Sequence, residues 1–383
     1  MDNLDFIRQY LNKMKHIQET ILDFIDNEGN DAIFLQDFKE YLEQEKIQEN
    51  VNDLKIVLRI ISKISAYHYR TPNFFLKIGQ ILLILKESIQ KILTNTEILF
   101  FFGESIPTLL FLIEEKILIV DEKLFNFIYS DDFEKDDIES DDIEYIYLLP
   151  KFMNFLNDSQ IEKIKNRYPQ ILDTEKFNQW KFIGENDSYI CQLIRNDSVE
   201  EFIAFINRNN IPLSSTIESS CYETNINFLI NDVSLIEYAA YYGSIQIFQY
   251  LKFNNVDLKK SLWDFVIHSN KPEMIHLMEE LQIEPEKDYV QYYIKAVQNH
   301  HNNIARYFKE NFLNSEDIPN AQNLIHFNFS IFLDIFNNDL DILNNKDQLN
   351  GLLLDFCGSG CYEVVDFLLN NFDVDINSKI IFF

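Results

Sequence analysis

The stretch from Ser234 to Leu251, SLIEYAAYYGSIQIFQYL, places Gly243 between two apolar runs in a chain with only 8 glycines among 383 residues. Both runs repeat their apolar residues at the three- and four-residue spacing of a short helix. Glycine readily takes the left-handed backbone conformation that ends a helix, and Ser244 is suited to begin the next one. The stretch therefore predicts a helix, a tight turn and a second helix. Because isolated helices this short are marginal in water, the pair needs neighbours.

Similar helix pairs follow along the chain with a period near thirty residues, roughly that of helical repeat proteins. Asn270, His300 and Gly360 take the place of Gly243 in SLWDFVIHSNKPEMIHLM, QYYIKAVQNHHNNIARYF and LLLDFCGSGCYEVVDFLLNNFDVDIN. Weaker copies occupy 190–207 and 324–338. Asparagine is the next best residue to glycine for a left-handed cap, so we expect these positions to share one kind of backbone site. The pattern indicates a stacked array of helix pairs.

These copies resemble the ankyrin repeat, whose pattern reads roughly T-P-L-H-x-A-A-x-x-G, then an apolar pair, then A-D-V-N. The residues that fit are Ser234, Ile236, Ala239, Ala240 and Gly243, with VDIN at 374–377 as the closing turn. The usual Pro is absent, and Glu237 stands where His is expected. The resemblance covers about residues 190–379 and extends to an uncharacterised ankyrin-containing family expanded in protozoan parasites. It implies an all-α fold, an α-solenoid of ankyrin-type helix-turn-helix repeats, and no particular activity.

Two regions follow from this pattern: a helical N-terminal region, 1–180, and the ankyrin-type array, 181–383. LKIVLRIISKIS (54–65) and FFLKIGQILLILKESIQKIL (74–93) repeat at helical spacing. Degenerate repeats in the first region would make one continuous solenoid, whereas their absence would leave two domains. The acidic run at 130–144 predicts a solvated outer loop, with a weak Ca²⁺ site or a docking strip for a basic partner as the sharper alternative.

The net charge of −29 argues against nucleic-acid binding, since affinity for phosphates comes largely from Lys and Arg. A protein partner would instead carry a basic or mixed surface. Charged residues interrupt the apolar stretch 98–120, so no membrane span is expected. The four cysteines are too widely spaced for a dense disulfide framework and no signal peptide is visible, which predicts a cytoplasmic protein.

No catalytic motif, phosphate-binding glycine loop or zinc-ligand set stands out, so we expect no cofactor, no metal and no enzymatic activity. The leading hypothesis is a protein–protein interaction scaffold that binds on the concave face of the array. The side chains predicted to contact the partner are Glu237, Tyr238, Tyr241, Asp264, Phe265 and His268. Tyrosine is a frequent interface anchor, although Tyr238 and Tyr241 would equally suit packing between neighbouring repeats.

The alternative hypothesis makes the N-terminal region a ligand-binding or catalytic unit that the repeats target. Its candidate residues are His68 and Arg70, which otherwise are expected at the surface end of a helix. The chain ends in NSKIIFF, where a polar capping repeat would be usual. Ile380–Phe383 either fold back over the last helix pair or promote self-association.

Overall fold

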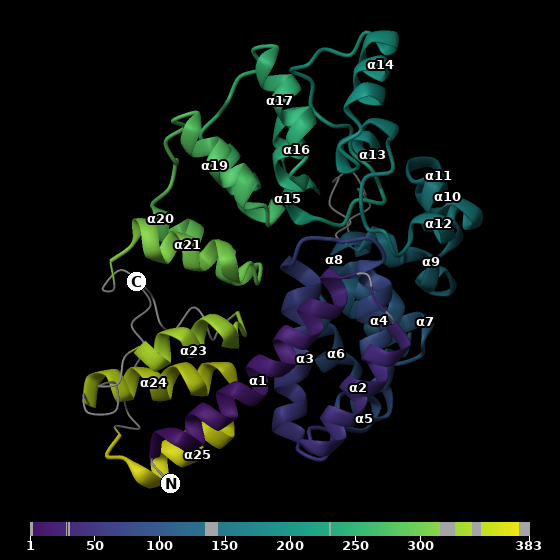
Figure 1. Ribbon diagram of the computed structural model, residues 1–383. Helices are drawn as coiled ribbons and strands as arrows, with labels where there is room; N and C mark the ends of the chain where they lie inside the picture. Colours follow the sequence, from purple (N-terminus) through teal and green to yellow (C-terminus); the bar gives the residue numbers. More distant parts are fainter. Residues whose placement is uncertain are drawn as a thin grey trace. The chain divides into compact units, whose positions relative to one another are not determined.

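The computed structural model describes residues 3–27, 29, 31–134, 145–229, 231–314, 326–338 and 346–374 (Figure 1). Within these ranges the regular structure is helical, and extended pairing is limited to one antiparallel bridge between Thr216 and Ser234. The predicted all-α class is confirmed. The acidic residues 135–144 and the apolar C-terminus, 375–383, lie outside the described residues, and so do the predictions made for them.

The chain divides into two compact units, which differ from the predicted regions 1–180 and 181–383. We call Met1–Thr71 together with Asn270–Phe383 the terminal unit, and Pro72–Ser269 the central unit. The terminal unit combines both ends of the chain because helix α1 (Asn3–Asp26) packs on α23 (Phe329–Asn338) and α25 (Tyr362–Asn371). The first residues of the chain thus belong with its last helices.

The terminal unit is organised around α1. Its other helices are α2 (Asp31–Gln44), α3 (Val51–Tyr67), α19 (Pro272–Glu280), α20 (Tyr289–Gln298), α21 (Asn302–Phe312) and α24 (Lys346–Ser359). Side chains at helical spacing along α1 are fully buried: Ile7, Leu11, Met14, Ile17 and Ile21. This face meets α2, α3, α23 and α25, so α1 occupies the core of the unit.

The first half of the central unit consists of short helices. They are α4 (Phe74–Ile84), α5 (Lys86–Ile92), α6 (Asn95–Phe102), α7 (Ile106–Glu114), α8 (Glu122–Glu134), α9 (Leu149–Phe152), α10 (Asp158–Arg167), α11 (Pro169–Leu172) and α12 (Thr174–Trp180), with 3-10 turns at Ile146–Leu148 and Met153–Phe155. Gly79 lets the ring of Phe111 on α7 lie directly against the backbone of α4, because a Cβ there would sit 2.4 Å from a ring atom. The interior of this region is filled by apolar side chains.

The second half of the central unit contains the stretch that opens the sequence pattern. Its helices are α13 (Tyr189–Arg195), α14 (Val199–Asn209), α15 (Ile226–Leu229), α16 (Leu235–Tyr242), α17 (Ile245–Phe253) and α18 (Leu262–Val266), followed by a 3-10 turn, η3 (Ile267–Ser269). Ser234 and Glu237 form a capping box at the start of α16, in which Glu237 Oε2 accepts the backbone N–H and the hydroxyl of Ser234 at 2.9 and 2.6 Å.

One type of turn recurs between paired helices in both units. Gly243 (φ 62°) donates its N–H to Ala240 O at 3.2 Å, and the next residue, Ser244, donates to Ala239 O at 2.9 Å. The same bonds, to the carbonyls three and five residues back, form at Asp197, His300 and Gly360. These residues have φ of 49°, 57° and 75°, and Asn270 has φ 52°. The prediction that Gly243, Asn270, His300 and Gly360 share one kind of backbone site is confirmed for their left-handed conformation, and Gly243, His300 and Gly360 also share the two hydrogen bonds.

The helices joined by this turn form packed hairpins. They pair α13 with α14 and α16 with α17 in the central unit, and α20 with α21 and α24 with α25 in the terminal unit. In the central unit α16 lies between α13 and α18, while α14 lies against α17, so first helices and second helices form two layers. Neighbouring hairpins therefore bury one another's apolar faces.

The hairpin of α6 and α7 resembles that of α16 and α17 at its two ends, although Gly103 after α6 has a right-handed φ of −57°. Thr94 and Glu97 form the same capping box at the start of α6, and Lys116 has φ 57° after α7, as Asn255 has φ 60° after α17. The similarity agrees with degenerate repeats in the N-terminal region, which remain a prediction.

Candidate functional site

The six residues predicted to contact a partner lie on adjacent elements of the central unit. Glu237, Tyr238 and Tyr241 are on α16, which packs against both α18 and η3. Asp264 and Phe265 are on α18, and His268 is in η3. The structure thus brings the six together, but Glu237, Tyr238, Tyr241 and His268 are buried. Only Asp264 and Phe265 are partly exposed.

Tyr238 is fully buried, so its prediction as a partner contact is wrong. Its hydroxyl accepts a hydrogen bond from Arg195 Nη1 at 2.6 Å, and Arg195 Nε pairs with Glu185 Oε2 at 2.9 Å. Burial raises the pKa of Tyr238 well above its ordinary value. The phenol is therefore a neutral hydrogen-bonding group, and its ring packs against Phe228 of α15.

Tyr241 and His268 stack on each other, with ring centroids 4.8 Å apart and planes 28° apart. The Tyr241 hydroxyl accepts a hydrogen bond from the Asn225 amide. Asn225 in turn is held by Glu223, whose Oε1 accepts its backbone N–H at 2.8 Å. These contacts connect α16 with η3 and with the loop before α15, so both rings serve packing within the central unit and are corrected from partner contacts.

Glu237 is also corrected, because its carboxylate satisfies neighbouring donors. Besides capping α16 through Ser234, its Oε1 accepts from the Ser261 hydroxyl at 3.3 Å. Ser261 occupies in its repeat the position that Ser234 occupies in the preceding one. The starts of two first helices consequently lie side by side.

The residues at the start of α16 also pair with an extended segment earlier in the chain, around Thr216. Ile217 N–H donates to Val233 O at 2.8 Å, and Leu235 N–H donates to Ser215 O at 3.1 Å. Thr216 is exposed beside Ser234 in this pairing. We call the resulting line of partly or fully exposed residues the finger row: Thr216, Ser234, Ser261, Asp264 and Phe265.

Arg195 and Glu185 are the residues that the sequence analysis missed. Arg195 ends the apolar helix α13, where its guanidinium also lies over the Tyr242 ring at 5.9 Å. The Tyr242 hydroxyl is buried without a hydrogen-bond partner among the described residues. The signal in the sequence was a single arginine, Arg195, at the end of an otherwise apolar helix, which could have indicated its buried ion pair with Glu185.

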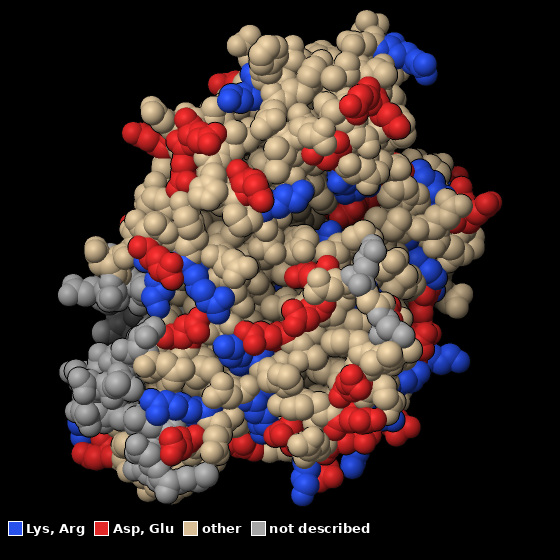
Figure 2. Space-filling model, in the orientation of Figure 1, with Lys and Arg blue, Asp and Glu red and all other residues tan. Residues whose placement is uncertain are grey.

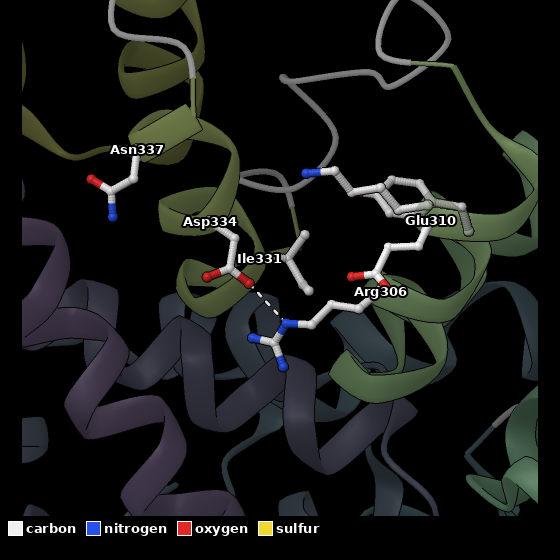
Figure 3. Close-up of a pocket in the computed structure, with 7 residues that line it drawn as sticks. Arg306, Glu310, Ile331, Asp334 and Asn337 are labelled. Atoms are coloured by element: carbon white, nitrogen blue, oxygen red, sulfur yellow. Dashed lines mark hydrogen bonds and ion pairs between the residues drawn. The ribbon is translucent and has the colours of Figure 1, made fainter.

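A pocket of about 540 Å³ lies in the terminal unit, between residues of α20, α21 and α23 (Figure 3). Its lining residues are Tyr293, Arg306, Lys309, Glu310, Ile331, Asp334 and Asn337. Arg306 and Asp334 point toward each other, with Nε and Oδ2 2.8 Å apart. The volume suits a small ligand. The pocket offers charges of both signs, because Lys309 and Glu310 line it together with the Arg306–Asp334 pair. None of the site residues predicted from the sequence lines this pocket.

His68, the candidate of the alternative hypothesis, is buried at the end of α3, where a surface position was expected. Its Nδ1 lies 2.9 Å from Asn299 O and its Nε2 lies 2.9 Å from Asp26 Oδ1. Both ring nitrogens are thus engaged within the terminal unit. Arg70 is half-buried. His68 therefore links the end of α3 to Asp26 and Asn299, and it does not line the pocket of Figure 3.

The four cysteines are free thiols, and Cys357 is the exposed one. In the part of the chain that the structure describes, no group of three or more His, Cys, Asp or Glu side chains is arranged to hold a metal ion. Among the same residues, none of the helices combines the length and the apolar character that crossing a membrane requires.

No protein-family model matches the chain, and neither a curated protein nor a solved structure is detectably similar to it. The relation of its hairpins to known repeats therefore depends on the residues and geometry described above.

Proposed function

We propose that the protein is a non-enzymatic scaffold of ankyrin-type repeats that binds a partner protein along the finger row. The observation that carries this proposal is the recurring turn: Asp197, Gly243, His300 and Gly360 have the same backbone conformation and the same two hydrogen bonds. A regular turn keeps successive hairpins in register, which lines up the starts of their first helices as an extended surface.

The partner is a protein with a basic or mixed surface. Acidic residues flank the finger row, since Glu218 and Asp232 are exposed and Asp264 is partly so. Acidic and basic side chains are interspersed over the face shown in Figure 2, which suits a partner of mixed charge. Association should be faster at low salt, because screening weakens the attraction between opposite charges. The free thiols support a cytoplasmic setting.

The alternative, a ligand-binding or catalytic unit at His68 and Arg70, is less well supported. The buried ring of His68 is engaged by Asp26 and Asn299, and the pocket of Figure 3 is lined by other residues.

The test is site-specific photo-crosslinking in cells that make the protein. We expect p-benzoylphenylalanine in place of Phe265 to capture a defined partner, and the same residue in place of Phe253, which is 86% exposed at the end of α17, to capture none. Asp264→Lys should abolish the product from position 265, whereas Glu201→Lys on α14 should not. Equal capture at both positions, or capture insensitive to Asp264→Lys, would contradict the proposed face.

A further inference from the structure

A buried hydrogen-bond network joins α1 to two later parts of the terminal unit. Gln18 on α1 is fully buried. Its Nε2 lies 2.9 Å from His300 Nδ1, in the turn between α20 and α21, and 3.1 Å from Asn328 Oδ1, just before α23. Its Oε1 accepts the Ser330 backbone N–H at 3.2 Å. One side chain thus links three elements that are far apart in the sequence.

The network fixes which form of His300 fits. The Ser330 N–H can only donate, so it orients the Gln18 amide with its oxygen toward Ser330 and its NH₂ toward His300. The Asn328 amide is oriented by a similar argument: its Nδ2 donates to Val297 O at 3.0 Å, so its Oδ1 accepts from the Gln18 NH₂ group. His300 Nδ1 must therefore accept a hydrogen bond, which only the neutral ring allows.

In the described part of the chain, the second ring nitrogen of His300, Nε2, has no hydrogen-bond acceptor that would stabilise a protonated ring. Nε2 is buried without a hydrogen-bond partner among the described residues, and the residue is only 3% exposed. A second proton would turn Nδ1 into a donor facing the Gln18 NH₂ group. The charged ring would then lack both water and an acceptor, which makes its burial costly.

The neighbouring charges reinforce this preference. Burial first, and then His68 just after α3, His326 before α23 and Lys63 on α3, lower the pKa of His300 well below its ordinary value. On the acidic side, Glu19 of α1 accepts the Ser330 hydroxyl at 2.9 Å, and Asp26 is bound to His68.

His301, next to His300 in the chain, faces His68, with ring centroids 5.2 Å apart. No carboxylate is hydrogen-bonded to His300 itself in the described part of the unit.

We propose that His300 is an acid-sensitive latch for helix α1: protonation of its ring breaks the Gln18 network and favours the opening of α1 away from the C-terminal helices. Because the native state disfavours the proton, the contribution of His300 to stability is complete above the ordinary histidine pKa. It is lost as the pH falls below about 6.5. A helix that leaves on acidification would uncover apolar surface of α23 and α25.

The experiment is hydrogen exchange of the full chain between pH 7.5 and 5, corrected for intrinsic exchange rates, with α17 of the central unit as internal reference. We expect the opening constant of α1 to rise relative to α17 by up to about tenfold per pH unit below pH 6.5, the limit for uptake of one proton. A flat ratio in the wild-type chain would overturn the proposal without any variant.

Two variants and one control sharpen the result. His300→Asn keeps a residue that tolerates the left-handed backbone, but it cannot titrate, so it should flatten the rise. Gln18→Glu supplies a carboxylate opposite His300 and should reverse the direction of the pH effect. His276→Asn, at an exposed histidine of α19, should leave the rise unchanged. An undiminished rise in His300→Asn would also overturn the proposal.

Discussion

The central and terminal units contain similar hairpins but hold them together differently. In the central unit, α16 packs against α13 and α18, which precede and follow it in the chain. In the terminal unit, α1 packs against α23 and α25, and Arg8 Nε donates to Asn337 Oδ1 at 3.3 Å across 329 positions. The comparison teaches that one turn pattern can serve both a local stack and a core closed by the two ends of the chain.

The largest effect that would test this difference is removal of α1. Deleting residues 1–26 removes five fully buried apolar side chains, each contributing about 1.5–3 kcal/mol. Their sum is comparable to the whole stability of a typical domain, about 5–15 kcal/mol. We expect hydrogen-exchange protection to be lost in α23 and α25 and retained in α16 and α17. Retained protection of α23 and α25 would show that the terminal unit does not depend on α1.

A large effect is also expected at the buried ion pair of the central unit. Arg195→Met leaves the Glu185 carboxylate and the Tyr238 hydroxyl without their donor, which should lower the free energy of unfolding by about 3–5 kcal/mol. Urea unfolding measures it. Glu185→Gln in the same chain should recover part of the loss, because the uncompensated charge is gone. No recovery would mean that packing of Arg195, and not its charge, matters.

The recurring turn gives a moderate effect with a matched control. Gly360→Ala forces an alanine into φ 75° and should cost about 1–2 kcal/mol. Gly358→Ala, two residues earlier, meets no atom within 4 Å of its new Cβ and lies in α24. It should stabilise slightly, by up to about 0.5 kcal/mol, because it replaces a glycine in the last turn of the helix, where the full interior effect does not apply. Thermal unfolding of both variants checks the opposite signs, and equal effects would contradict the left-handed turn.

A further effect, in α24, depends on pH. Burial raises the pKa of Asp355 to about 7, so the native state retains a proton that the unfolded state releases near pH 3.8. The stability contributed by this carboxyl is therefore lost as the pH rises from about 4 to 7. Asp355→Asn should raise the unfolding midpoint at pH 8 and have little effect at pH 4. A stabilisation that is equal at both pH values would exclude this titration as the cause.

The sequence predicted the hairpins because their signals are local. Gly243, Asn270, His300 and Gly360 could be aligned by the spacing of apolar residues on either side, and the structure places them at one kind of turn. Tyr238 could not be assigned in the same way. A tyrosine has an apolar ring and a polar hydroxyl, so it can lie at a surface or in a core. Which of the two it does depends on whether the fold supplies a buried hydrogen-bond donor such as Arg195.

The position of α1 could not be predicted because its partners lie at the opposite end of the chain. Phe6 stacks on Phe367, with ring centroids 4.5 Å apart, yet no local pattern around either residue specifies the other. The same holds for Gln18 and His300, whose contact depends on the tertiary fold. The sequence predicted one helical region over residues 1–180 and left the packing partners of α1 open.

The central claim, that α1 forms one cooperative unit with the last helices of the chain, is tested most directly by native-state hydrogen exchange in increasing denaturant. The account predicts that slow amides of α1, α23 and α25 merge into one unfolding event with a common free energy and denaturant dependence. If α1 amides instead merged with those of α4 and α7, or exchanged independently of α23 and α25, the two-unit organisation would be contradicted.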